Sequence, residues 1–164
     1  MKAQSIILIL ATLSTGVMAG LFFTWSNTVT SGIGRLSDVE YLRSFQAMNR
    51  TILNPAFFLA IFGAAVLLPL SSFLHLRLKP QNLFWMLLIA SLLYLIGVII
   101  VTFVGNIPLN TILDKTQLND ISLEDAKTLR ESFENKWNLL NWIRTYSALA
   151  AFILLIICSI TSKI

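Results

Sequence analysis

Four long apolar runs constrain the fold of this chain more than any other feature. They cover about residues 5–25, 52–74, 83–105 and 142–160, and the only charged side chain within those bounds is Arg144, near the start of the fourth run. A helix needs about 20 apolar residues, at about 1.5 Å each, to cross the roughly 30 Å hydrocarbon core of a bilayer. The runs therefore predict an all-α fold: an integral membrane four-helix bundle that forms a single domain over residues 1–164.

The first run has one alternative interpretation. The start "MK", the apolar stretch and "VMA" at residues 17–19 resemble a secretory signal peptide with its cleavage site. The apolar run continues past that point through "GLFFTW", however, and this favours a retained helix.

The composition agrees with a membrane protein. The chain is 56% hydrophobic and 12% charged, whereas about a quarter of the residues of a soluble domain are charged. Its net charge of +4 comes from basic residues scattered between the apolar runs, without the basic stripe of a nucleic-acid-binding surface. We therefore expect a multi-pass membrane protein, with membrane lipid and no nucleic acid among its partners.

The charged residues favour one orientation in the membrane. All eight acids fall in the two longer connections, at 26–51 and 106–141, whereas the turn at 75–82 and both termini hold basic residues and no acid. These basic residues are Arg77, Lys79, Lys2 and Lys163. By charge density, both termini and the short turn face the cytoplasm, and both long connections lie outside. The raw count of Lys and Arg gives the opposite orientation, but either one puts both long connections on the same side.

Each long connection also predicts a helix. In the first, one face of a short amphipathic helix from Asp38 onward is marked by Val39, Leu42, Phe45, Gln46 and Met48. In the second, Ser122 and Asp125 form the start of a capping box. The helix that begins there can run on into the fourth apolar run.

Two residue types are too rare for several kinds of redox or metal site. Cys158 is the single cysteine, which excludes an intrachain disulfide and chemistry by paired cysteines. His75 is the single histidine, which excludes haem held by two of the chain's own histidines and most single-chain zinc and di-iron sites. We therefore expect no metal and no cofactor.

Polar groups gather at one end of the predicted bundle, the end that carries the long connections. Each of the four helices contributes to this set: Thr24; Asn49, Arg50 and Asn54; Asn106 and Asn110; and Trp137, Asn141, Arg144 and Thr145. Polar side chains in lipid are costly unless they are paired or face a cavity. We therefore predict a polar pocket at this end. A channel would need polar lining along its length, and proton or ion transport would need carboxylates inside the membrane.

The stretch "NIPLN" at residues 106–110 has two interpretations. In the simpler one, Asn106 caps the third helix and Pro108 prevents its continuation. That interpretation leaves Asn110 unexplained. In the other, the stretch is one wall of the pocket, and Pro108 fixes the chain so that both amides point inward.

Simpler structural roles are open for other polar and small residues too. Arg50 and Asn54 are four residues apart and would share a helix face, but Asn54 can also be an N-cap and Arg50 an anchor at the lipid headgroups. Trp and Arg near the start of the fourth helix can likewise be headgroup anchors. Gly16 and Gly20 form a G-x-x-x-G pattern, which favours close helix packing.

Four motifs in order resemble the anthrone oxygenase family of small four-helix membrane proteins. They are "GLFFTWSNTVTSGIGRL", "FQAMNRTILNPAFF", "GNIPLN" and "W…NWIRT", and the resemblance extends from about residue 16 to about residue 150. The chain departs from the family pattern at Leu140, where the family often has a second Trp, and at Trp142, where it often has a polar residue.

This resemblance implies an activity and a set of site residues. Fungal members of the family oxidise anthrones to anthraquinones with O2, without metal or flavin. A small lipophilic or aromatic substrate and O2 are therefore the expected partners. The implied catalytic candidates are Arg144, Arg50, Asn106 and Asn141, and the implied substrate-binding candidates are Asn49, Asn54, Asn110, Trp137 and Thr145. Thr24 is a further substrate-binding candidate because it lies at the same end of the bundle. No histidine lies at this end and no general base is evident, so Glu134 and Asp114 are base candidates only as acids of the long connection.

Two hypotheses of different class follow. In the first, the chain is a cofactor-free oxygenase whose arginines and amides stabilise a substrate enolate. In the second, it is a non-catalytic membrane subunit or a lipophile-binding protein. A cavity of roughly 300 Å³ or more, lined by these groups and by aromatic residues, favours the first. A closed cluster in which every amide is paired with backbone favours the second.

Overall fold

The structure is a computed structural model that describes residues 3–78 and 80–162, and within them it is helical without strands. Its α-helices are α1 (Ala3–Thr24), α2 (Thr30–Ile33), α3 (Asp38–Ile52), α4 (Pro55–His75), α5 (Asn82–Tyr94), α6 (Ile107–Lys115) and α7 (Leu123–Thr161). Three π-helical segments join some of them: η1 (Trp25–Val29), η2 (Leu95–Ile100) and η3 (Thr102–Asn106). Lys2, Lys79 and Lys163, which the orientation argument used, lie outside the described residues.

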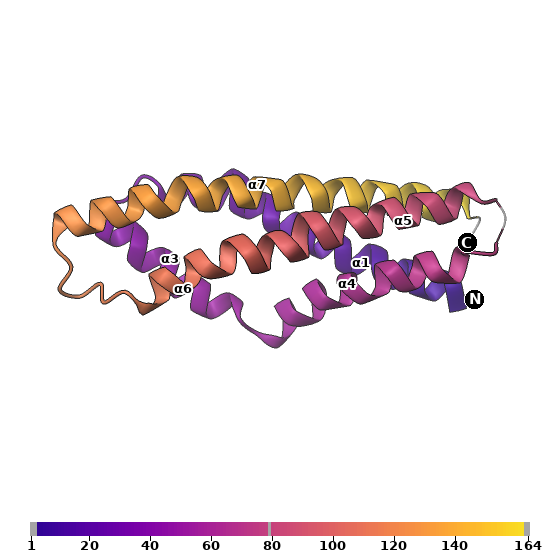
Figure 1. Ribbon diagram of the computed structural model, residues 1–164, viewed down its shortest axis with the longest axis horizontal. Coiled ribbons are helices and arrows are strands. Elements are labelled where there is room, and N and C mark those ends of the chain that lie inside the picture. The colour runs from indigo at the N-terminus through magenta and orange to yellow at the C-terminus, as the bar shows by residue number, and fades with distance from the viewer. Residues whose placement is uncertain (1–2, 79, 163–164) are drawn as a thin grey trace.

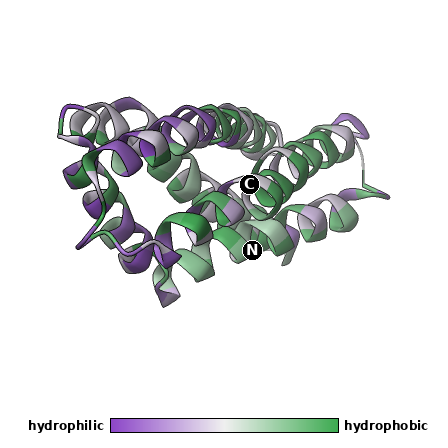
Figure 2. Cartoon of the chain, turned by 60° about the vertical axis from the view of Figure 1, so that its left-hand side comes forward, coloured by the Kyte–Doolittle hydropathy of each residue, from purple (hydrophilic) through white to green (hydrophobic). Residues whose placement is uncertain are grey.

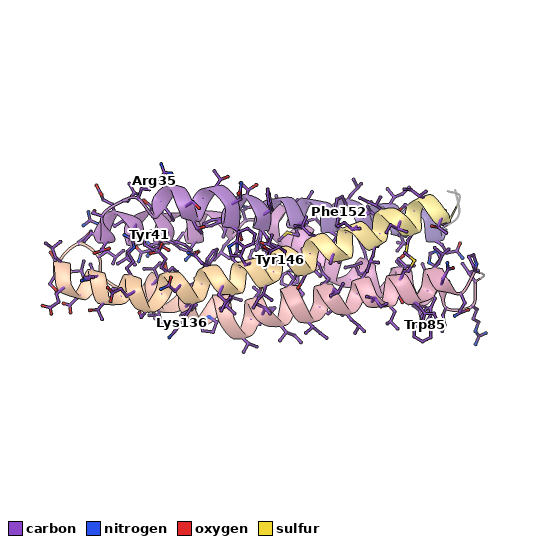
Figure 3. The ribbon with its side chains drawn as sticks, turned by 90° about the horizontal axis from the view of Figure 1, so that it is seen from above. Arg35, Tyr41, Trp85, Lys136, Tyr146 and Phe152 are labelled. Atoms are coloured by element: carbon purple, nitrogen blue, oxygen red, sulfur yellow. The ribbon has the colours of Figure 1, made fainter. Side chains whose placement is uncertain are left out.

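Four continuous helical stretches are long and apolar enough to cross a membrane, so the predicted all-α, four-span fold is confirmed. They are Ala3–Ile33, Pro55–His75, Asn82–Lys115 and Leu123–Thr161. The described ends of the chain lie together at one end of the bundle, and α3 and α6 lie at the other (Figure 1). Figure 3 likewise places Arg35 and Tyr41 at one end and Trp85 near the opposite end. Hydrophobic residues cover most of the bundle, and hydrophilic residues gather towards the end that holds α3 (Figure 2).

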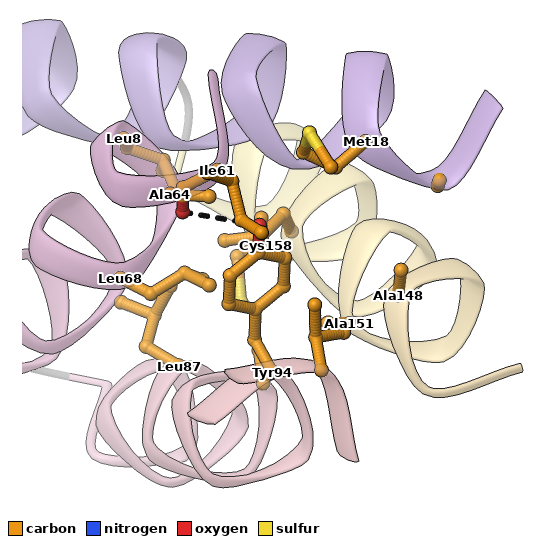
Figure 4. Close-up of a cluster of buried hydrophobic side chains, with 14 of the residues drawn as sticks. Leu8, Met18, Ile61, Ala64, Leu68, Leu87, Tyr94, Ala148, Ala151 and Cys158 are labelled. Atoms are coloured by element: carbon orange, nitrogen blue, oxygen red, sulfur yellow. Dashed lines mark hydrogen bonds between the residues drawn. The ribbon is translucent and has the colours of Figure 1, made fainter. Parts of the chain in front are cut away.

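The main core lies between α1, α4, α5 and α7. Buried alanines on all four helices, such as Ala11, Ala64, Ala90 and Ala151, let the backbones approach closely. Tyr94 of α5 fills the centre and donates a hydrogen bond from its hydroxyl to the carbonyl oxygen of Ile61 on α4, at 3.2 Å (Figure 4). The outward faces carry exposed leucines, isoleucines and phenylalanines, as a lipid-facing surface requires.

A second core of buried residues joins α3, α6 and α7 at the polar end, with Tyr41, Phe45, Leu113 and Phe133 among its members. Arg130 of α7 fixes this layer. Its guanidinium lies 4.4 Å from the centre of the Tyr41 ring and donates to Asp38 at 3.0 Å, to Glu134 at 2.7 Å and to the carbonyl oxygen of Gly34 at 2.7 Å.

The predicted helices of the long connections are confirmed. α3 begins at Asp38 with a capping box between Ser37 and Glu40. Ser122 caps α7 by accepting a hydrogen bond from the Asp125 backbone nitrogen at 3.1 Å. From this cap, α7 continues without a break through the fourth apolar run.

The structure corrects three details. The helix does not end at Asn106, because η3 leads directly into α6 and Pro108 occupies its first turn, where proline is tolerated. Arg50 and Asn54 do not share a helix face, since the chain breaks between α3 and α4 at Leu53 and Asn54.

The third correction concerns the glycine pattern of α1. A Cβ at Gly16 would lie 2.7 Å from the Phe152 ring of α7, so this glycine does permit close packing. A Cβ at Gly20 would have no neighbouring atom within 4 Å, so Gly20 plays no such part.

A pair of glycine substitutions tests how closely the helices pack, with Gly97 at a contact with α7 and Gly20 at a position without one. In Gly97→Ala the new methyl would lie 2.5 Å from Ser147 Cβ on α7, and such overpacking costs about 1–3 kcal/mol. Gly20→Ala, which meets no atom, should be neutral or gain up to about 1 kcal/mol from helix propensity. The measurement is thermal unfolding in detergent.

Gly97→Ala/Ser147→Gly should recover the lost stability, because it removes the atom that the methyl meets. Equal unfolding temperatures for Gly97→Ala and Gly20→Ala would contradict the predicted contact between α5–η2 and α7.

Candidate functional site

A cavity of about 420 Å³ lies at the polar end of the bundle, between α1, α3, α4, η3–α6 and α7. Most of its wall is apolar or aromatic and includes Leu21, Phe22, Ile52, Phe57 and Ile61. Its buried polar lining comprises Asn49, Thr102, Asn106, Asn141 and Arg144. The volume exceeds the roughly 300 Å³ at which small-molecule sites begin.

Asn141 ties the polar wall to α1. Its Nδ2 donates to the Ser26 hydroxyl at 2.7 Å and to the carbonyl oxygen of Phe22 at 3.2 Å. Thr145, one turn further along α7, donates to the Asn141 carbonyl oxygen at 2.8 Å and shares a hydrogen bond with Ser26 at 3.0 Å. Ser26 lies in η1, so the π-helical segment presents this hydroxyl to α7. π-helical turns are frequent at functional sites.

Arg144 is the most unusual side chain of the cavity, because it is 6% exposed and carries a charge. Its Nη2 donates to Asn141 Oδ1 at 2.6 Å and its Nη1 to Thr102 Oγ1 at 3.4 Å. Its Nε is buried and has no partner. The guanidinium lies over two rings, 4.7 Å from the centre of Phe22 and 5.4 Å from that of Trp137.

Arg144 also lacks a carboxylate partner in the part of the chain that the structure describes. The ion pairs among residues 3–78 and 80–162 are Arg50–Asp114, Lys127–Glu131, Arg130–Asp38 and Arg130–Glu134. Neutral oxygens therefore hold this buried cation, and a buried cation without a counter-ion favours an anionic ligand.

Asn106 and Asn49, two residues of the cavity wall, have buried polar atoms without a hydrogen-bond partner among the described residues. Asn106 is 1% exposed, and neither its Oδ1 nor its Nδ2 has a partner. The Nδ2 of Asn49 is likewise buried without a partner. Unpaired polar groups in an apolar interior cost about 1–3 kcal/mol each. A ligand that hydrogen-bonds to them would remove this cost.

Aromatic rings form the wall nearest to α3. Trp137 donates from Nε1 to Asn110 Oδ1 at 2.8 Å, which fixes its ring. It packs edge-on against Phe45 at 4.7 Å and in a tilted arrangement against Trp25 at 5.4 Å between ring centres. Beyond them, burial raises the pKa of the Tyr41 phenol above its ordinary value, helped by the nearby carboxylate of Glu134. Tyr41 therefore stays neutral.

An ion pair lies at the more polar rim of the cavity. Arg50 Nε donates to Asp114 Oδ1 at 2.6 Å, and both side chains are at least half exposed. Arg50 Nη2 also reaches the Asp114 carbonyl oxygen at 3.3 Å. Arg50 is therefore a rim residue engaged with α6, whereas Arg144 lies buried in the wall.

The structure brings most of the predicted site residues together and leaves three of them out of the cavity wall. Asn49, Arg50, Asn106, Asn110, Trp137, Asn141 and Arg144 line the cavity. Thr145 supports it from behind through Ser26 and Asn141.

Thr24 and Asn54 do not line the cavity. Thr24 donates to the carbonyl oxygen of Gly20 within its own helix. Asn54 caps α4 by accepting from the Phe57 backbone nitrogen at 3.1 Å, so its simpler interpretation is the correct one. Of the two base candidates, Asp114 is a lining residue, whereas Glu134 is bound to Arg130 away from the cavity.

Sequence reasoning missed Ser26 and Trp25. The buried face of the first helical stretch runs through Thr15, Phe22, Ser26 and Thr30. The residues singled out from the sequence were instead Gly20, for helix packing, and Thr24, for the pocket. The four-residue spacing of Phe22, Ser26 and Thr30 was the available signal.

A metal site finds no support in the donor set. Within residues 3–78 and 80–162, no three His, Cys, Asp or Glu side chains are close enough to hold one ion. What the cavity offers instead is a buried guanidinium, free amides and aromatic walls.

A family model described as anthrone oxygenase matches residues 51–154. The match includes α4 to α6 and most of α7, and with them Asn106, Asn110, Trp137, Asn141 and Arg144. No curated protein sequence and no solved structure matches the chain.

Two Asn→Leu substitutions should separate a structural amide from a ligand-binding one. Asn141→Leu removes the hydrogen bonds that this amide makes with Ser26, the Phe22 carbonyl oxygen and Arg144, and should lower the free energy of unfolding by about 1–3 kcal/mol or more. Asn106→Leu breaks no hydrogen bond and should leave stability unchanged or raise it. Thermal unfolding in the same detergent measures both.

An equal loss in both variants would mean that Asn106 has a structural partner and is not free for a ligand.

Proposed function

The chain belongs to the anthrone oxygenase family, and we propose that it oxidises an enolisable aromatic lipophile with O2, without a cofactor, in the cavity between α1, α3, α4, η3–α6 and α7. The observation that carries this proposal is the buried guanidinium of Arg144, which has no carboxylate partner in the described part of the chain. Such a group stabilises negative charge that develops on a bound substrate.

The substrate's oxygen is the group that Arg144 would recognise. A ketone whose neighbouring carbon is acidic ionises to an enolate, and its charge concentrates on oxygen. The free Nε of Arg144 and the free Nδ2 atoms of Asn106 and Asn49 are donors for that oxygen. In an apolar cavity these charge-assisted hydrogen bonds are stronger than in water.

The aromatic walls suit a flat ring. Trp137, held by Asn110, and Phe22 and Trp25 of the first helical stretch line the same cavity. Aromatic pairs gain about 0.5–1.5 kcal/mol beyond the area that they bury. A polycyclic substrate is therefore bound by stacking, and its single polar edge is directed to Arg144.

The reaction needs only these groups and O2. The substrate CH2 loses one proton to give the enolate, which transfers an electron to O2. The resulting carbon radical and superoxide combine, and a C–O bond forms. After protonation, the hydroperoxide loses water as the second hydrogen leaves the carbon as a proton, and a C=O group remains. One oxygen atom enters the product and the other enters water.

We propose that Asp114 accepts the first proton. It is the only carboxylate that lines the cavity among the described residues, and it lies at the polar rim. From there the proton can pass to bulk solvent.

We also propose a bacterial inner membrane location with both described ends of the chain on the cytoplasmic side. In support, Arg77 lies at that end without an acid, and the acidic residues lie at the end that holds α3 and α6. The cavity then opens towards the outer half of the bilayer.

Removal of the buried guanidinium should abolish most of the activity. Arg144→Met is expected to lower kcat by about 10²–10³-fold, the usual cost of one transition-state donor. The assay is O2 uptake by purified, metal-free protein with anthrone as substrate. Arg77→Met, an exposed residue at the opposite end, is the matched control and should keep full activity.

Arg144→Lys distinguishes folding from chemistry. It keeps the charge and should recover part of kcat, and unfolding temperatures close to the parent's establish that both variants are folded. The proposal fails if the parent protein does not accelerate oxidation above autoxidation. Saturable anthrone binding without turnover would instead identify a lipophile-binding protein.

The ion pair at the rim provides a second test of the mechanism. Asp114→Asn removes the proposed proton acceptor, so kcat should fall. Arg50→Gln breaks the same ion pair but leaves the carboxylate, so it should retain most of kcat. If both variants lose kcat to the same extent, Asp114 is a structural partner of Arg50 and not the proton acceptor.

A further inference from the structure

The rim of the cavity is apolar on one side. Five of its lining residues are large hydrophobic side chains that are also 40–63% exposed: Leu53, Phe58, Phe62, Phe103 and Ile107. A residue that lines a cavity and is also exposed lies at its opening. We call the opening that these five residues form the portal. The start of α4 lies on one side of it, and η3 and α6 lie on the other.

The fold explains why an opening exists at this place. α4 packs against α1 and α5, whereas α6 packs against α3. The chain breaks at Leu53 and Asn54, and the first turns of α4 therefore follow a different course from α3. Phe58 and Phe62 lie on those turns, across from Phe103 and Ile107.

The portal faces hydrocarbon rather than water. Phe58 and Phe62 belong to the membrane-crossing stretch Pro55–His75, and Phe103 and Ile107 to Asn82–Lys115. A contiguous set of exposed phenylalanines and aliphatic residues would be unfavourable in water but is the ordinary surface of a membrane protein in lipid.

The other rim of the cavity, which holds Arg50 and Asp114, is closed by an ion pair and by hydrogen bonds. Arg50 and Asp114 form their ion pair there. Gln46 donates from Nε2 to the carbonyl oxygen of Leu113 at 2.8 Å, and Arg43 donates to that of Leu118 at 3.0 Å. These bonds fix the end of α6 and the following loop to α3.

From this geometry we infer that the substrate enters sideways from the bilayer through the portal between α4 and η3–α6. The substrate is therefore an uncharged lipophile dissolved in the membrane, not a compound joined to a charged or water-soluble carrier. A charged group would have to cross hydrocarbon and the apolar rim, at a cost of several kcal/mol. Ionisation takes place only inside, next to Arg144. The inference of a substrate rests on the proposed function, whereas the route itself can be measured without turnover.

The test uses Trp137 as the reporter, because it is 4% exposed and lines the cavity. The full chain with Trp25→Phe, Trp85→Phe and Trp142→Phe retains this one tryptophan and is reconstituted in phosphatidylcholine vesicles. The probe is a nitroxide-bearing alkane, which dissolves in hydrocarbon and quenches tryptophan at close range. We expect concentration-dependent quenching of Trp137.

A narrowed portal should stop this quenching. Leu53→Phe/Ile107→Phe adds bulk at the rim and should lose most of it. The matched control is Leu59→Phe/Ile112→Phe, which makes the same changes on exposed positions of α4 and α6 that do not line the cavity, and it should behave like the parent. Unchanged unfolding temperatures establish that all three proteins are folded.

Two results would overturn the inference. One is equal alkane quenching in the narrowed and control variants. The other is quenching by aqueous acrylamide but not by the alkane, which would place the entrance at the Arg50–Asp114 rim. O2 uptake distinguishes this failure from failure of the proposed function: turnover without portal-dependent quenching contradicts only the route, and portal-dependent quenching without turnover contradicts only the oxygenase activity.

Discussion

The burial of one guanidinium in an apolar bundle is the constraint on which the polar end of this structure depends. Arg144 is held by Asn141 and Thr102, and Asn141 is held in turn by Ser26 and the Phe22 carbonyl oxygen of α1. None of these partners carries a charge. The network fixes the position of the cation but leaves its charge uncompensated, which is the condition that favours an anion.

The two ends of the bundle differ in how tightly they are packed: a close-packed core fills one end, and the other end contains the cavity. Towards the end with the chain termini, alanines and Tyr94 close the space between four helices. Towards the other end, η1 and η3 present Ser26, Thr102 and Asn106 inward, and α3 supports the helices from the side. A wide, partly unsatisfied cavity is unfavourable for stability, so the tightly packed half supplies the stability that the cavity lacks. Separation of these two parts is common where function requires strained or unsatisfied groups.

Much of this structure could be predicted from particular residues. The apolar runs predicted the four spans, Ser122 predicted a helix start, and the one-sided set of amides and arginines predicted the end that contains the cavity. "NIPLN" does lie in the wall, with Asn106 and Asn110 both lining the cavity. Asn54 and Arg50 were harder to place, because an amide next to Pro55 can cap a helix or line a pocket, and only the break between α3 and α4 decides which.

The sequence by itself determined the number of spans and the end at which polar chemistry gathers, because hydrophobic length and the cost of polar groups in lipid are local properties. Only the tertiary structure decided which helix face points inward. In a membrane bundle the lipid-facing and core-facing sides are both apolar, so periodicity does not separate Ser26 from Thr24. The tertiary structure also decided that, among the described residues, Arg144 has no acidic partner whereas Arg50 has one. Asp114 reaches Arg50 from 64 residues away, and only packing brings α3 and α6 together.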